Sequence, residues 1–68
     1  MNNELILKNN IKDFRKQKGI LQDELAQKVG TTRQTIIAIE KGQFNPSAKL
    51  ALLICYALDT TFEELFYF

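Results

Sequence analysis

Apolar residues recur three or four positions apart along most of this chain, in segments separated by glycine, proline and short polar runs. The breaks fall at Gly19, Gly30, Gly42, Pro46 and residues 59–61. A period near 3.6 favours helices, and glycine and proline interrupt them. The pattern therefore predicts an all-α domain, a compact bundle of five short helices.

Capping residues set the expected bounds of these helices. Thr32 and Ser47 are typical N-cap residues, and Thr61-x-x-Glu64 has the form of a capping box. Gly30 suits the left-handed residue that often ends a helix. The predicted helices cover residues 9–18, 22–29, 33 to about 41, 47 to about 58, and a short segment after Thr61.

The two ends of the chain depart from the helical pattern. The segment ELIL at residues 4–7 and the segment FYF at residues 66–68 are rich in residues that favour strands. We expect them to form two short strands that pair with each other.

The second and third predicted helices are joined by the tight turn of residues 30–32. This is the helix-turn-helix arrangement. An ordinary pair of helices shares an apolar seam but does not require a small residue such as Ala26, a turn glycine and a fixed interval together. The seam is expected at Leu25, Val29, Ile36 and Ile39.

Four motifs occur in register along this region: Gln-x-x-Leu-Ala, the turn glycine, Ile-x-x-Ile-Glu and Asn-Pro-Ser. In these motifs the chain resembles the helix-turn-helix repressors of the lambdoid phage and Xre type, over about residues 7–66. The resemblance implies a five-helix bundle whose third helix enters the major groove of DNA. It also implies that Gln22 lies near the phosphate backbone, and that Arg15 pairs structurally with Glu40.

Side chains at the start of the third helix have the chemistry needed to read bases. Arg33 can donate two hydrogen bonds to guanine, and Gln34 can pair with adenine through both amide atoms. Ile37 suits a thymine methyl group, and Thr32 caps the helix beside a phosphate. The alternative is a solvated polar surface, and for the phosphate candidates Lys41 and Asn45 that alternative has equal weight.

The chain also departs from the family pattern. Leu21 stands where a polar N-cap is usual, so we expect the second helix to be poorly capped. Ile37 and Ala38 replace polar residues, which favours recognition with fewer hydrogen bonds and more methyl contacts.

Charge divides the chain although its net charge is only +1. Residues 1–49 hold nine Lys/Arg and five Asp/Glu, which gives +4, whereas residues 50–68 hold three acids and no base, which gives −3. The acidic part should face away from DNA. Its apolar side chains predict a homodimer interface, with the alternative that they only cover the monomer's own core against ELIL. The expected interface residues are Leu53, Tyr56, Phe62, Phe66, Tyr67 and Phe68.

Length and composition narrow the other possibilities. We expect one domain over residues 1–68, since the chain is too short for two. It has no histidine and a single cysteine, Cys55, which we expect to be a small buried hydrophobe, so no disulfide, zinc site or cofactor is predicted. No serine, cysteine or lysine has a visible base partner, which argues against an enzyme. Without a signal peptide or membrane span, the expected location is the cytoplasm.

These features together predict a regulator that binds double-stranded DNA, a repressor acting as a homodimer on a near-palindromic operator. No small-molecule ligand is expected. The alternative is an antitoxin-like module that covers a partner protein. A neighbouring toxin gene would favour this alternative.

Overall fold

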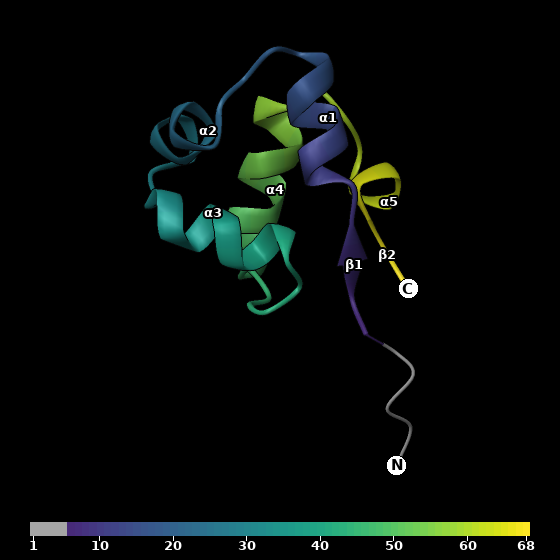
Figure 1. Cartoon of the computed structure of the whole chain (residues 1–68). Helices are drawn as coiled ribbons and strands as arrows, with labels where there is room; N and C mark the ends of the chain where they lie inside the picture. The colour runs from purple at the N-terminus through teal and green to yellow at the C-terminus, as the bar shows by residue number, and fades with distance from the viewer. Residues whose placement is uncertain (1–5) are drawn as a thin grey trace.

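Five helices and two short strands follow one another in the order β1, α1, α2, α3, α4, α5, β2 in a computed structural model that describes residues 6–68 (Figure 1). The strands pair antiparallel, so that Lys8 lies opposite Tyr67 and Asn9 opposite Phe66. The elements span Lys8–Asn9 (β1), Ile11–Gln17 (α1), Gln22–Val29 (α2), Arg33–Glu40 (α3), Ala48–Ala57 (α4), Phe62–Leu65 (α5) and Phe66–Tyr67 (β2).

Helix α4 occupies the middle of the fold, with α2 and α3 on one side and α5 and the strand pair on the other (Figure 1). The predicted seam between α2 and α3 is fully built, because all four of its side chains and Ala26 are buried. Burial of these apolar groups is the main force that holds the short helices together. The rest of the core comes from Ile11, Ala51, Ile54, Cys55, Leu58, Leu65 and Phe66.

The predicted caps explain where the helices begin. Thr32 Oγ1 accepts from the backbone N–H of Thr35 at 3.3 Å, and Ser47 Oγ accepts from that of Leu50 at 3.1 Å. Thr61 and Glu64 form the expected capping box before α5. Hydrogen bonds lower the pKa of the Glu64 carboxyl. The bond from the Thr60 hydroxyl has the largest effect, and the bonds with Thr61 add to it.

The N-terminus of helix α2 is better capped than we expected from Leu21. A leucine side chain accepts no hydrogen bond, but Glu24 Oε1 accepts from the Leu21 backbone N–H at 2.8 Å. The glutamate thus supplies half of a capping box. At the other end Gly30 has a φ of 76°, the left-handed conformation in which glycine avoids the strain of a Cβ atom.

The chain ends pair as predicted, but one strand lies elsewhere than expected. It forms at Lys8–Asn9, whereas Ile6 and Leu7 precede it and residues 4–5 fall outside the described part of the chain. The first helix accordingly begins at Ile11 and not at residue 9. Helical spacing could not show this, because the pairing partner is at the opposite end of the sequence.

Cys55 is buried in α4, as predicted. Burial raises the pKa of its thiol. This environment keeps the sulfur protonated, as expected of a packing residue.

Candidate nucleic-acid interface

Helix α3 has one buried face and one exposed face. Ile36 and Ile39 fix the buried face in the core. Because the helix starts at the tight turn and its Thr32 cap, Arg33 and Gln34 are exposed at its first turn. Among residues 6–68, neither of these two side chains makes a hydrogen bond or an ion pair. Their donors and acceptors are therefore available to an outside partner.

The middle of the same helix is less exposed than its start. Ile37 and Ala38 are both partly buried, so only part of the Ile37 side chain is open to solvent. Part of the Ile37 side chain is thus exposed beside the polar pair, and Ala38 offers no side-chain hydrogen bond.

The loop after α3 continues the exposed surface. Lys41 follows the helix, and Asn45 lies just before Pro46; both are exposed. Phe44 is also exposed, at 49% of its surface, between these two candidates for phosphate contact. Our sequence reasoning missed Phe44. An aromatic residue in a short polar loop was the only signal for it.

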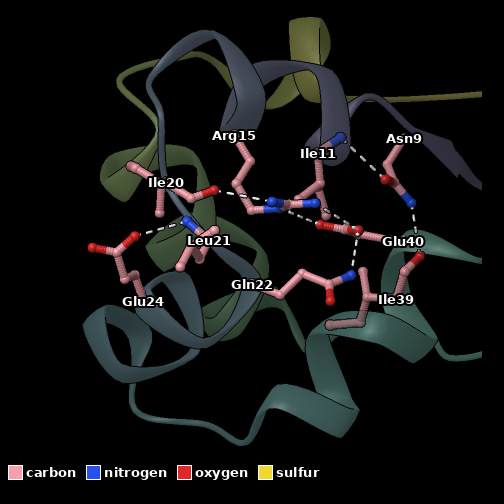
Figure 2. A network of polar contacts seen from close by, with 9 residues as sticks. All are labelled: Asn9, Ile11, Arg15, Ile20, Leu21, Gln22, Glu24, Ile39 and Glu40. Carbon is pink, nitrogen blue, oxygen red and sulfur yellow. Dashed lines mark hydrogen bonds and ion pairs between the residues drawn. The ribbon is translucent and has the colours of Figure 1, made fainter.

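A network of buried polar contacts holds the far end of α3 (Figure 2). Arg15 Nε donates to Glu40 Oε2 at 2.8 Å, and the two side chains are only 9% and 7% exposed. The Arg15 guanidinium also donates to the backbone carbonyl of Ile20 at 2.9 Å. The Arg15 side chain thus joins α1 to the loop that follows it and to the end of α3.

Gln22 belongs to this network in the free protein. Its Nε2 donates to Glu40 Oε1 at 3.0 Å, and the residue is partly buried (Figure 2). The resemblance had implied a place near phosphate for Gln22. The structure gives its amide a second role, because it donates a hydrogen bond to the buried Glu40 carboxylate.

A second group of exposed apolar side chains belongs to the acidic, C-terminal part of the chain. Tyr56 on α4 is 89% exposed, and Leu53, Phe62, Tyr67 and Phe68 are exposed as well. Leu52 joins them at 59% exposure, although we did not predict it.

Phe66 does not belong to this surface, which corrects our expectation. It is only 4% exposed and packs in the core, with its ring centroid 5.0 Å from that of Phe62. Antiparallel pairing turns alternate residues to opposite sides. One aromatic of the FYF tail therefore faces inward.

Residues 6–68 contain neither a membrane-spanning helix nor a metal site. No helix there combines the length and the apolar character required to cross a bilayer. No group of acidic or cysteine side chains in the same stretch is placed to hold a metal ion.

The fold and the exposed first turn of α3 define a helix-turn-helix domain that binds DNA. A helix-turn-helix family model matches residues 11–65, which is most of the chain. The protein belongs to this Cro/C1-type family of helix-turn-helix transcriptional regulators, which are DNA-binding proteins and not enzymes.

Relatives and solved structures agree with this assignment. An uncharacterised HTH-type transcriptional regulator of Archaeoglobus fulgidus is 44% identical over 62 residues, covering 91% of this chain and 89% of the relative. The regulator YgzD of Bacillus subtilis, also uncharacterised, is 46% identical over 61 residues, covering 90% and 92%.

Two solved structures share the fold. The restriction-modification controller protein C.AhdI from Aeromonas hydrophila is similar with a TM-score of 0.74 at 33% identity, covering 79% of this chain and 78% of that one. The clp gene regulator ClgR from Corynebacterium glutamicum has a TM-score of 0.73 at 27% identity, covering 76% of this chain and 55% of that one.

Proposed function

We propose that this protein represses transcription in the cytoplasm as a homodimer that binds a near-palindromic DNA operator. The observation that carries the proposal is the exposed couple Arg33 and Gln34, which make no hydrogen bond or ion pair within residues 6–68, on a helix whose other face is fixed in the core. A core-anchored helix with exposed bidentate groups at its first turn suits direct readout of base edges in the major groove.

Each residue has a distinct part in this proposal. Arg33 recognises guanine, Gln34 recognises adenine, and the open part of Ile37 contacts a thymine methyl group. Groups around them position the helix on the backbone without reading sequence. These phosphate-side candidates are Gln22, Thr32, Lys41 and Asn45.

Dimerisation follows from the exposed apolar surface on the acidic part. Contiguous apolar side chains exposed on a small protein usually mark an interface. We define the dimer face as Leu52, Leu53, Tyr56, Phe62, Tyr67 and Phe68, all exposed in the monomer. A two-fold axis through this face makes the contact isologous.

Such a dimer presents two copies of α3 to one side of the duplex. Helix-turn-helix dimers place these helices about 34 Å apart, one turn of DNA. The operator should therefore contain two related half-sites in opposite orientation. A dimer bound across a promoter blocks polymerase, which is the simplest route to repression.

The direct test is selection of binding sites from random duplex DNA, followed by footprinting. The proposal expects enriched, near-palindromic sites and protection of both half-sites. Enrichment of no common sequence would refute sequence-specific binding.

The dimer face has its own test in sedimentation. The parent should sediment as a dimer at micromolar concentration, whereas Leu53→Lys/Tyr56→Lys and a chain lacking Tyr67 and Phe68 should be monomers, because charge or loss of apolar area disfavours the interface. Leu21→Lys is the matched control, since Leu21 is an exposed leucine outside the face.

Circular dichroism must show that the variants retain their helices. A parent that is monomeric and protects one half-site would exclude this interface. Binding of the same face to a different protein would then favour the antitoxin-like alternative.

Salt dependence tests the phosphate contacts. Binding releases counterions from DNA, so the logarithm of the affinity should fall with the logarithm of salt concentration. Lys41→Ala should reduce the magnitude of this slope by about one. Lys12→Ala serves as the control, because Lys12 is an exposed lysine on α1, outside the helix-turn-helix. An unchanged slope for Lys41→Ala would remove Lys41 from the interface.

A further inference from the structure

The side chain of Asn9 connects the two-stranded sheet to the end of α3 (Figure 2). Its Nδ2 donates to the backbone carbonyl of Ile39 at 2.8 Å. Its Oδ1 accepts from the backbone N–H of Ile11 at 3.2 Å. Both ends of the amide are therefore engaged, and Asn9 is partly buried. The contact with Ile39 joins segments that are far apart in the sequence.

The Ile39 carbonyl lies in the last turn of α3. Carbonyl groups in this turn have no partner within the helix and must find one elsewhere. The N–H of Gly42 donates to this oxygen at 2.9 Å, and Asn9 supplies a second donor. Asn9 is itself held in place by the register of β1, opposite Phe66 in the core.

This contact differs from the Arg15–Glu40 ion pair. The ion pair acts on a side chain of α3 and links it to α1. Asn9 acts on the backbone of α3 and links it to the sheet, which contains the C-terminal strand β2. The two contacts together restrain the end of α3 from two elements.

The end of α3 affects the position of its reading residues. At a rise of 1.5 Å per residue, Gln34 lies about 8 Å along the axis from Ile39. A tilt of about 10° around Ile39 would move it by roughly 1.4 Å over that length. Hydrogen bonds form only within a few tenths of an ångström around 2.9 Å. A small tilt is therefore enough to break a bidentate contact with a base.

We propose that Asn9 is a positioning residue for DNA recognition. By holding the end of α3 against β1, it sets the angle at which Arg33 and Gln34 meet the bases. This inference rests on the proposed function of α3 as the reading helix. Loss of the contact should reduce discrimination between DNA sequences more than it reduces binding to DNA as such.

Two substitutions separate the two hydrogen bonds of Asn9. Asn9→Asp keeps an acceptor for the Ile11 N–H but turns a second oxygen toward the Ile39 carbonyl. Asn9→Ser keeps a hydroxyl acceptor near Ile11, is neutral, and is too short to reach Ile39. Both variants remove the bond to α3.

The adjacent Asn10 provides a matched control. Its Nδ2 donates to the backbone carbonyl of Glu64 at 3.2 Å in an exposed position, and among the described residues its side chain makes no hydrogen bond to α3. Asn10→Asp therefore adds the same charge one residue away and also removes one hydrogen bond.

The measurement is the ratio of affinities for a selected operator and a scrambled duplex, well below the melting temperature. Asn9→Asp and Asn9→Ser should lower this ratio by roughly 3- to 10-fold, the equivalent of about one hydrogen bond. Asn10→Asp should leave it unchanged. A purely structural role would lower stability and reduce both affinities in proportion. An unchanged ratio in the Asn9 variants would overturn the proposal.

Hydrogen exchange without DNA distinguishes the possible failures. The N–H groups of Gly42 and Gln43 close the end of α3, at 2.9 Å from the carbonyls of Ile39 and Ala38. They should exchange faster in the Asn9 variants than in the parent or Asn10→Asp, and equal exchange would overturn the proposal. If the parent protein does not distinguish operator from scrambled DNA, both the proposed function and the positioning role are refuted. The exchange rates would still show whether the Asn9 contact restrains α3.

Discussion

Arg15→Ala should lower the free energy of unfolding by about 3–5 kcal/mol, the largest effect we expect from a single substitution. The arginine side chain contributes to three contacts: two with Glu40 and one with the carbonyl of Ile20. Its removal leaves the Glu40 carboxylate buried, with Gln22 as its remaining side-chain donor among residues 6–68. Thermal and urea unfolding would measure the loss.

The size of this effect matters because the domain is small. With 68 residues its total stability should lie near the lower end of the usual 5–15 kcal/mol. Arg15→Ala could therefore leave much of the chain unfolded at 37 °C. A melting temperature equal to that of the parent would show that the pair contributes nothing to stability.

Two controls isolate the buried charge as the cause. Lys18→Ala removes an exposed pair, since Lys18 Nζ lies 3.9 Å from Asp59 Oδ2 and both side chains are open to solvent. It should leave the melting temperature almost unchanged. The double change Arg15→Met/Glu40→Leu removes both charges, and it should recover much of the stability lost in Arg15→Ala.

Gln34→Ala should weaken binding to the operator by roughly 1–3 kcal/mol, which is about 5- to 150-fold, while binding to random DNA changes little. A bidentate contact with adenine depends on the base, so its loss lowers discrimination. Arg33→Ala should cost a similar amount at the operator. It should also weaken binding to random DNA, because its positive charge is attracted to every phosphate backbone.

The control for base reading is Gln17→Ala, which removes an exposed glutamine from the end of α1. This variant should bind both kinds of DNA like the parent. If Gln34→Ala keeps the parent's full preference for the operator over scrambled sites, Gln34 does not read a base.

The spacing of apolar residues and caps was sufficient to predict the helices. The predicted range of α2 is identical to the observed one, and α3 and α4 differ by about a residue at their ends. Helix formation depends on contacts within a few residues, so local sequence carries its signal. The turn glycine and the buried seam were predictable for the same reason, and with them the exposure of Arg33 and Gln34.

The apolar surface was harder to predict because α4 is apolar on almost every side. Its sequence AKLALLICYA offers several leucines, and spacing alone does not show which of them the neighbouring elements cover. Leu52 proved to be exposed. Phe66 proved to be buried, because its partner strand turns it toward the core.

The sequence by itself determined the helices, the helix-turn-helix and the exposed polar groups at the start of α3. Only the tertiary structure decided how the ends of the chain are used. Asn9 bonds to Ile39, Gln22 bonds to Glu40, and β1 pairs with β2 between residues at opposite ends of the chain. No local pattern specifies these partners, because they meet only after the core has formed and has brought distant segments together.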